Sequence, residues 1–582
     1  MATLESIFRE LCGPGPDPAC LLRWPPDLFV FTSRALGTSD AYRAIVSPPT
    51  GRNWPPHEGW VESVQKAGRE WCAFLEGKGA KSWIQMRSAG HYAKGLSSPI
   101  RVQELERRWK RLRKCWKVDL QSLCAELGQP LDELRWQGLL DLVALHAIAD
   151  SACAPLFAAE VPRPEVPRTE VPRPVVPRPG GFADAAWARL HGGASLATFE
   201  RSQGCVLPKT HTTQLGLTLR SLSHHLAFHR YATRVEWWRP YSEFTSASSW
   251  GAPSADAVAP RISVLLFPWP HQIHSGMFGP LDVGQPIVDG YGYFHFNPGA
   301  SEDDLLRPAL RSVIEAARRE LGDDQVVDLL VMPETSMRDR DWDHLRTVLS
   351  EGETGFRSYV VGLRSLVPDQ FGDNRAEVGF FLDSGDGGKR VVYLHQHKHH
   401  RWRLDEGQIR GYNLGARLDP KKLWWEGIRI PERKVTFVEP IPGITVCPLI
   451  CEDLARQDPV ASMLRTVGPS LVICLLMDGP QFASRWSSKY ASVLADDPGS
   501  SVLTLTSKGM VDRWSSPYSP SREVVALWRD QKGMTQELDL CGSDALLLRL
   551  RREGGTEYTI DGRKAERQRL VLEGVTRLRA RG

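Results

Sequence analysis

The sequence predicts an α/β fold for the C-terminal half of the chain and a mainly α-helical fold for the N-terminal part. The chain has 582 residues, which is too long for one ordinary hydrophobic core, so more than one domain is expected. From about Pro260 onward, apolar strand-like runs alternate with helical segments and turns, a pattern typical of sheets covered by helices. Apolar residues make up 42% of the chain and charged residues 24%, which is the composition of a globular protein.

The N-terminal region, residues 1–157, contains two clear helical patterns. In residues 101–117 the apolar residues recur at alternating steps of three and four, which indicates an amphipathic helix. Residues 133–157 are largely apolar and predict a second, mostly buried helix. The first helix carries eight Lys or Arg against two Glu. This charge is compatible with a nucleic-acid or protein partner, although a solvated face on a core helix is the more frequent case.

A proline-rich repeat separates this region from the rest of the chain. Residues 158–181 repeat the motif EVPRP, and proline has no amide N–H and a fixed φ, so a helix or a central strand is excluded there. We expect a polyproline II spacer with a reach of about 60–70 Å, with a ligand for a partner domain as the alternative. Residues 182–258 are expected to form a helical connecting region, because the run TTQLGLTLRSLSHHLAFHRYATRVEWW has a helical pattern.

Residues 259–582 are predicted to form the α/β domain. The runs RISVLLFPW, VVDLLVMP, SYVVGL, GITVCPLI and SLVICLLM predict strands, because each is short and apolar. The run EDDLLRPALRSVIEAARREL predicts a helix with acidic residues in its first turn. The run VGFFLDSGDGGKRVVYLHQHK predicts a hairpin with a glycine-rich turn.

Reactive side chains follow three of these apolar runs. Glu334 follows VVDLLVMP, Lys398 follows VVYLHQH, and Cys451 follows GITVCPLI. A carboxylate can act as a base, an ammonium group can stabilise an oxyanion, and a thiol becomes a nucleophile once a base or a cation activates it. Cys447 lies four residues before Cys451, so a redox or metal pair is a competing interpretation, although further zinc ligands are not evident.

The order and spacing of these three motifs resemble the nitrilase superfamily of carbon–nitrogen hydrolases, whose members share an α-β-β-α sandwich. The resemblance covers about half of the chain, from about residue 259 to about residue 550. It implies that Glu334 is the general base, that Lys398 helps to hold an oxyanion and that Cys451 forms a thioester. It also implies a second glutamate shortly after the lysine, for which Glu406 is the best candidate and Asp405 the fallback.

Two residues after the cysteine have expected roles as well. The backbone amide of Glu452 is the natural second donor to an oxyanion, because it directly follows the nucleophile. Asp453 matches an aspartate that often stands two positions after the family's cysteine, and its expected role is structural, at the turn.

The resemblance implies a small-molecule substrate with an amide, carbamoyl or nitrile group, and it requires no metal and no organic cofactor. Family members commonly self-associate, so a homo-oligomer is expected. A secretory signal and a run long enough to cross a bilayer are not evident, so a cytoplasmic protein without membrane contact is expected. In the alternative, the N-terminal module senses nucleic acid or a protein partner, and the C-terminal half is a gated effector or a binding protein without turnover.

Overall fold

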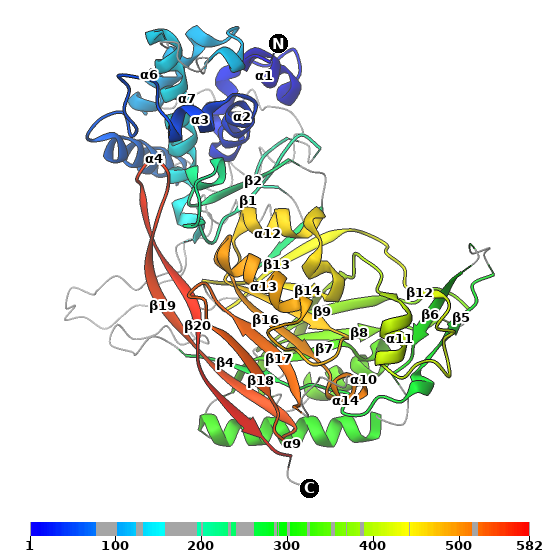
Figure 1. Cartoon of the computed structure of the whole chain (residues 1–582). Helices are drawn as coiled ribbons and strands as arrows, with labels where there is room; N and C mark the ends of the chain where they lie inside the picture. The colour runs from blue at the N-terminus through cyan, green and yellow to red at the C-terminus, as the bar shows by residue number, and fades with distance from the viewer. Residues whose placement is uncertain are drawn as a thin grey trace, which may run out of the picture.

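The protein combines a helical N-terminal domain with two large facing β-sheets (Figure 1). A computed structural model describes residues 2–76, 102–123, 132–157, 195–199, 202–230, 234–239, 261–284, 288, 290–298, 303–322, 326–350, 355–367, 369–383, 389–441, 443–514 and 522–580. The predicted proline-rich spacer, residues 158–181, lies outside these ranges. The predicted α/β class with a helical N-terminal region is confirmed.

The helical domain is built around one buried helix. Its helices are α1 Leu4–Cys12, α2 Pro25–Thr38, α3 Ala41–Val46, α4 Trp60–Glu76, α6 Gln103–Leu112 and α7 Glu133–Ala152. Helix α7 contacts α2, α4 and α6, so it is apolar on most of its faces. Helix α4 can lie close to α7 because Gly68 has no side chain: a Cβ there would lie 2.5 Å from Cβ of Ser151. The predicted amphipathic helix within residues 101–117 and the predicted buried helix within 133–157 are confirmed as α6 and α7.

Helix α7 also corrects an expectation about membrane segments. The segment Glu133–Leu156 has a mean hydropathy of 1.5 and is long and apolar enough to cross a membrane, contrary to the expectation that no run reaches that length. However, 83% of its apolar window is buried inside the protein. The hydropathy of this segment is therefore accounted for by its place in the core of the helical domain.

Two seven-stranded sheets form the larger part of the molecule. The first has the order β10-β9-β8-β7-β4-β19-β20, and the second has the order β18-β17-β16-β15-β14-β13-β3. Strand β7 contacts β15 and β16, and β10 contacts β13 and β14, so the sheets pack face to face. The strands of the first sheet are β4 Ile262–Leu266, β7 Val327–Arg338, β8 Phe356–Arg364, β9 Asn374–Asp383, β10 Lys389–His397, β19 Ala545–Tyr558 and β20 Lys564–Leu578. Those of the second are β3 Arg234–Trp238, β13 Lys434–Ile441, β14 Ile444–Ile450, β15 Leu471–Leu476, β16 Ser501–Thr506, β17 Val524–Arg529 and β18 Thr535–Asp539.

Helices cover the outer faces of both sheets. Helices α9 and α10 contact β7 of the first sheet, and α13 contacts β16 and β17 of the second. A smaller four-stranded sheet of order β11-β12-β6-β5 lies at one end of the sandwich (Figure 1). The remaining elements are α9 Asp303–Leu321, α10 Asp339–Ser350, α11 Glu406–Gly411, α12 Ser462–Val467, α13 Trp486–Asp496, α14 Lys508–Arg513, β5 Phe278–Leu281, β6 Tyr291–Phe296, β11 Arg403–Leu404 and β12 Leu423–Glu426. The five predicted strands, the predicted helix and the predicted hairpin of this half are all present.

The expectation of a helical connecting region is wrong for the described part of residues 182–258. This part contains β1 Cys205–Pro208, β2 Leu226–His229 and β3. For the segment that leads into β2, the reason is a contact that the local pattern does not reveal: the carboxylate of Asp150 accepts the backbone N–H groups of His224, His225 and Leu226. Amides held in this way are not available for the i to i−4 bonds of a helix. Strand β3 joins the second sheet beside β13, so the sheet extends beyond the predicted boundary at residue 259.

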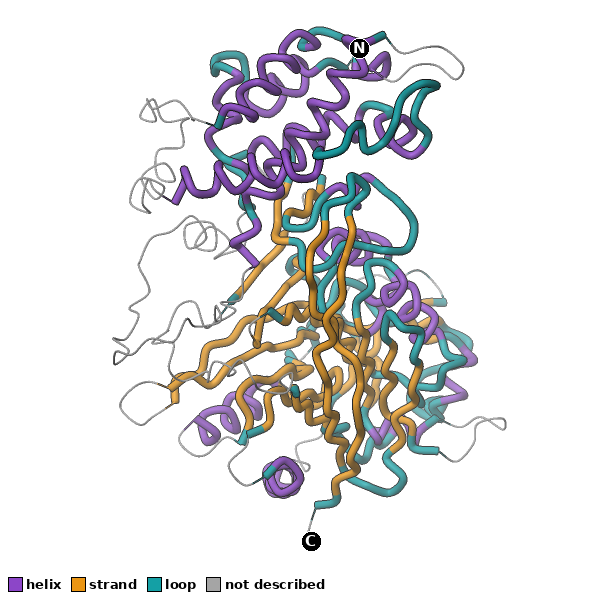
Figure 2. Tube along the Cα trace, turned by 90° about the vertical axis from the view of Figure 1, so that its left-hand side faces the viewer, coloured by secondary structure: helices purple, strands orange, loops and turns teal. Residues whose placement is uncertain are grey.

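The hairpin of β19 and β20 links the two parts of the molecule. It runs from the first sheet up to the helical domain (Figure 2), where Nε1 of Trp54 donates to the backbone oxygen of Ile560 at 2.9 Å. Near its tip, Arg563 is fully buried and forms ion pairs with Asp150 of α7 at 2.8 Å and with Asp561 at 3.0 Å. The charge of Arg563 keeps the pKa of Asp150 low, although burial raises it. The helical domain is therefore anchored to the sheets by a buried ionic contact.

Replacing Arg563 with Met is expected to lower the free energy of unfolding by about 3–5 kcal/mol, because the carboxylate of Asp150 then stays buried without its cation. Urea unfolding followed by tryptophan fluorescence measures this change. The matched control is Arg311→Met, which removes an 80% exposed partner of Glu315 in an ion pair worth about 1 kcal/mol or less. Equal urea midpoints for the two variants would show that the buried contact contributes no more than a surface pair.

Candidate active site

The three predicted catalytic side chains come from both large sheets: two from strands β7 and β10 of the first sheet, and one from strand β14 of the second. Glu334 lies in β7, Lys398 directly follows β10, and Cys451 directly follows β14. Strand β7 contacts the second sheet, and β10 contacts β14. All three residues are buried, with 3%, 1% and 3% of their surface exposed. Lys398 contacts Glu334 directly, and the charges of both residues act on the thiol of Cys451, so the three lie within electrostatic range of one another.

Glu334 lies on an irregular part of β7 that packs tightly against β8. The pairing of β7 with β8 shifts register between Met332 and Met337, and Thr335 has a positive φ of 50°. The neighbouring strand has a glycine, Gly362, opposite Pro333 and Glu334. A Cβ on Gly362 would lie 2.2 Å from the backbone oxygen of Pro333 and 2.5 Å from Cα of Glu334. Gly362 therefore fixes how closely β8 approaches the glutamate.

Cys451 occupies a sharp turn at the end of β14. Its φ is 45°, in the left-handed region that non-glycine residues seldom adopt. A short 3₁₀ helix, Cys451–Ala455, begins at this residue. The thiol of Cys474 on the next strand donates to the backbone oxygen of Cys451 at 3.8 Å. Strained backbone of this kind concentrates at functional positions, where the surrounding structure holds it in place.

The ammonium group of Lys398 lies between two carboxylates. Its Nζ is 2.8 Å from Oε1 of Glu334 and 2.7 Å from Oε2 of Glu426. An ammonium group has three N–H donors, so one remains for a further acceptor. Oε2 of Glu334 is buried and has no hydrogen-bond partner within the described part of the chain. One N–H of Lys398 and Oε2 of Glu334 are thus available for a further hydrogen bond or for proton transfer.

Glu426, at the end of β12, makes the contact with Lys398 that the sequence analysis expected of Glu406. Glu426 is 4% exposed and also accepts hydrogen bonds from Arg364 at 3.2 Å and from the backbone N–H of Trp402 at 3.2 Å. Glu406 instead begins α11, has a 60% exposed side chain and pairs with Arg410. The expectation for Glu406 is corrected accordingly, and Asp405 caps α11 by accepting from the N–H of Gln408. The sequence signal for Glu426 was a carboxylate after the short apolar run LWW, as Glu334 is a carboxylate after the apolar run VVDLLVMP.

Asp453 connects the turn of the cysteine to the segment of the lysine. It is fully buried, and its oxygens accept the backbone N–H of His399 at 3.1 Å and Nδ1 of His400 at 2.8 Å. His399 directly follows Lys398, so one carboxylate fixes the segment of the lysine relative to the turn of the cysteine. This contact agrees with the structural role expected for Asp453. The side chain of Glu452 pairs with Arg456 at 2.9 Å, and the oxyanion role of its backbone amide remains a prediction.

Burial and charge shift the pKa values of this site in a consistent way. Burial, and then the charge of Glu334, raise the pKa of the Cys451 thiol well above its usual value. Burial also raises the pKa of Glu334, against the opposing charge of Lys398. For Lys398, burial lowers the pKa, but the charges of Glu334 and Glu426 outweigh it, and the pKa lies well above its usual value. The resting site therefore holds a neutral thiol beside a permanent cation and a carboxylate of increased basicity.

A layer of polar and aromatic side chains lies close to the thiol, beyond the end of β15. Asp478 accepts hydrogen bonds from the hydroxyl of Tyr412, from Arg485 at 2.6 Å and from Nε1 of Trp486 at 3.0 Å. The charge of Asp478 also raises the pKa of Cys451, so this carboxylate lies within electrostatic range of the thiol. The guanidinium of Arg485 stacks on Trp514, 4.6 Å from the ring centroid. These contacts join α11, α13 and the segment after α14 beside Cys451.

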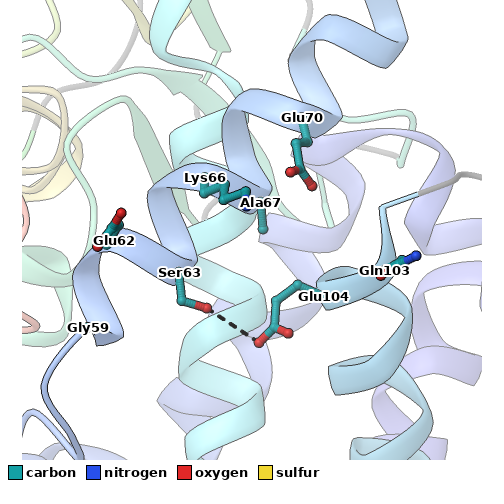
Figure 3. Close-up of a pocket in the computed structure, with 8 residues that line it drawn as sticks. All are labelled: Gly59, Glu62, Ser63, Lys66, Ala67, Glu70, Gln103 and Glu104. Carbon is teal, nitrogen blue, oxygen red and sulfur yellow. Dashed lines mark hydrogen bonds between the residues drawn. The ribbon is translucent and has the colours of Figure 1, made fainter.

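Other candidate sites carry less chemistry. In the part of the chain that the structure describes, no group of three or more His, Cys, Asp or Glu is arranged to hold a metal ion. In the basic helix α6, Arg108 and Arg111 form ion pairs with the buried Asp141, so part of its positive charge is compensated internally. A pocket of about 400 Å³ lies between α4 and α6 (Figure 3), where Ser63 donates to Glu104 at 3.5 Å. None of the three predicted catalytic residues lines this pocket.

Comparison with known proteins gives distant structural likenesses to amidases. No protein-family model matches the chain, and no curated protein matches it. An amidase from Nesterenkonia sp. has a similar structure with 14% sequence identity and a TM-score of 0.30; the match covers 51% of this chain and 93% of the amidase.

Two further structures of the Nesterenkonia amidase match in the same way. One is described as a mutant of an amidase from the nitrilase superfamily, with 12% identity, a TM-score of 0.28 and coverage of 48% of this chain and 87% of the amidase. The other is a mutant in complex with butyramide, with 13% identity, a TM-score of 0.28 and coverage of 49% and 90%. At these scores the likeness carries no argument, so the proposal for this chain rests on the geometry of its own site.

Replacing Gly362 with Ala is expected to displace Glu334, because the new Cβ would overlap the backbone of Pro333 and Glu334. We expect the rate of Cys451 alkylation to fall by about tenfold or more, and the melting temperature to fall as well. The control is Gly554→Ala in β19, where an added Cβ meets no atom within 4 Å. Alkylation in Gly362→Ala at the rate of the Gly554→Ala variant would contradict this role for Gly362.

Proposed function

We propose that this protein is a thiol-dependent hydrolase of a non-peptide carbon–nitrogen bond, of the nitrilase type, with an amide, carbamoyl or nitrile substrate. The catalytic residues are Glu334, Lys398 and Cys451, and Glu426 is the second glutamate. The observation that carries the proposal is the buried ammonium group of Lys398 between the two carboxylates, within electrostatic range of a cysteine on a strained turn. Facing sheets with helices on their outer faces agree with the sandwich of that family.

In the first half of the reaction on an amide, Cys451 attacks the carbonyl carbon. Oε2 of Glu334 takes the thiol proton as the carbon–sulfur bond forms, because the thiol itself holds its proton at neutral pH. The third N–H of Lys398 and the backbone N–H of Glu452 donate to the oxyanion. Glu334 then returns the proton to the nitrogen, the carbon–nitrogen bond breaks, and ammonia or an amine leaves a thioester on Cys451.

In the second half, water hydrolyses the thioester. Glu334 takes a proton from the water as its oxygen attacks the acyl carbon, and the same two donors hold the second oxyanion. The carbon–sulfur bond breaks, the sulfur regains a proton and the acid leaves. Each side chain returns to its starting state, so the cycle consumes only substrate and water. In the resting site Lys398 is protonated, because the charges of Glu334 and Glu426 outweigh the effect of burial and hold its pKa well above its usual value.

Alkylation of the cysteines by iodoacetamide, mapped peptide by peptide as a function of pH, tests the proposal without knowledge of the substrate. Cys451 is expected to react faster than Cys447, which is buried in β14, although both thiols have raised pKa values. The rate should fall as the pH drops through the raised pKa of Glu334, because a protonated carboxyl group cannot accept the thiol proton. Glu334→Gln should slow the reaction at neutral pH by about 10²–10⁴-fold and remove this pH dependence.

The exposed Cys541 provides the internal reference for reagent and fold in each sample. If Cys451 reacted no faster than Cys447 in the full chain, and Glu334→Gln changed nothing, the catalytic proposal would fail. That outcome would favour the alternative of a gated effector or a non-catalytic binding protein, which the low exposure of Cys451 also fits.

The two candidate glutamates give a separate prediction. Glu426→Gln is expected to reduce the alkylation rate of Cys451 by about tenfold or more, because Lys398 loses one of its two anionic partners. Glu406→Gln is expected to leave the rate unchanged, because its carboxylate contacts Arg410 on the surface. Measuring both variants beside the unmodified chain decides the assignment. A slower rate in Glu406→Gln and a normal rate in Glu426→Gln would reverse it.

A further inference from the structure

One buried amide group contacts both carboxylates of the site. Asn374 is the first residue of β9 and is fully buried. Its Nδ2 donates to Oε1 of Glu334 at 2.7 Å and to Oε1 of Glu426 at 2.8 Å. Its Oδ1 has no hydrogen-bond partner in the described ranges, so the two carboxylates alone determine which way the amide faces.

The donors are distributed unequally over the oxygens of Glu334. Oε1 accepts from Asn374 and from Lys398, whereas Oε2 has no partner among the described residues. A carboxylate oxygen with two charged or polar donors is stabilised in its ionised form and is a poor site for a proton. The proton from a neighbouring thiol therefore goes to the oxygen without donors.

We propose that Asn374 is a positioning residue, which together with Lys398 occupies Oε1 of Glu334 and so reserves Oε2 for exchanging a proton with Cys451 and the leaving nitrogen. This inference rests on the proposed function. Asn374 acts through Glu334 and does not touch the reacting atoms.

The chemistry of the side chain fits this role better than its near equivalents. An amide NH₂ has two N–H donors and no charge, so it can bind two carboxylates without adding to the charge of the site. An aspartate of the same shape would place a third carboxylate there. The backbone oxygen of Asn374 also accepts the N–H of Lys398 at 2.9 Å. One residue thus orients the two glutamates through its side chain and the lysine through its backbone.

A pH profile separates this role from simple packing. Loss of the Asn374 hydrogen bond removes a contact that lowers the pKa of Glu334, so that pKa rises. Activity depends on ionised Glu334, and the acid limb of the Cys451 alkylation profile should therefore move to higher pH. We expect a shift of about one to two pH units in Asn374→Ala, the range for a hydrogen bond to a charged group. Asn374→Asp, which keeps the shape and adds a negative charge, should shift the limb at least as far.

The control for packing is Gln396→Ala. Gln396 is also a fully buried amide in the same sheet, but its Nε2 donates to the backbone oxygen of Pro448 at 2.6 Å and its Oε1 accepts from Thr436. This variant should lower the melting temperature and leave the acid limb where it is. If Asn374→Ala does not fold, the isosteric Asn374→Asp variant decides the test.

The outcomes distinguish this inference from the proposed function. The inference is supported if the acid limb of the alkylation profile moves to higher pH in the Asn374 variants and keeps its pH in Gln396→Ala. The inference is overturned if the acid limb keeps its pH in both Asn374 variants. If Glu334→Gln still abolishes the limb in that case, the proposed function is unaffected. A profile for Cys451 that does not respond to Glu334→Gln overturns both.

Discussion

The ammonium group of Lys398 is the interaction on which the organisation of the site depends. It lies within 2.8 Å of one carboxylate and 2.7 Å of another, all in the interior of the protein. Two buried carboxylates without a cation would repel each other, and burial of each charge alone costs several kcal/mol. The segments that meet there come from β7, β9, β10 and β12, so the lysine also joins strands of two different sheets.

The electrostatics of the site favour a nucleophile that is protected at rest. A thiol with a raised pKa is a weak nucleophile and resists oxidation, because both reactions proceed through the thiolate. The carboxylate of Glu334, whose pKa is also raised, is a stronger base than an exposed glutamate. In the proposed reaction, proton transfer and bond formation are then coupled events, which occur when an electrophilic carbon is held beside the sulfur.

Local patterns in the sequence predicted helices α6 and α7 as well as the strands, the helix and the hairpin of the α/β half. Short apolar runs in the sequence singled out Glu334, Lys398 and Cys451. Lys398 and Cys451 directly follow β10 and β14, whereas β7 continues to Arg338, so Glu334 lies inside its strand, at a register shift. Glu426 was missed because β12 pairs with the distant β6, which brings this glutamate to a lysine 28 residues away. Strand β2 was missed because the acceptor of the amides that lead into it, Asp150, belongs to the helical domain. Strand β3 was missed because its partner β13 is about 200 residues away in the sequence.

The hairpin of β19 and β20 has a consequence for the order of events during synthesis. Asp150 and Arg563 are separated by 413 residues, and a ribosome adding about 5–20 residues per second needs roughly 20–80 s to make that stretch. For this time the nascent helical domain holds a carboxylate whose cation has not yet been made. Its final packing must therefore wait until the segment around Arg563 has been made, long after the helical domain itself.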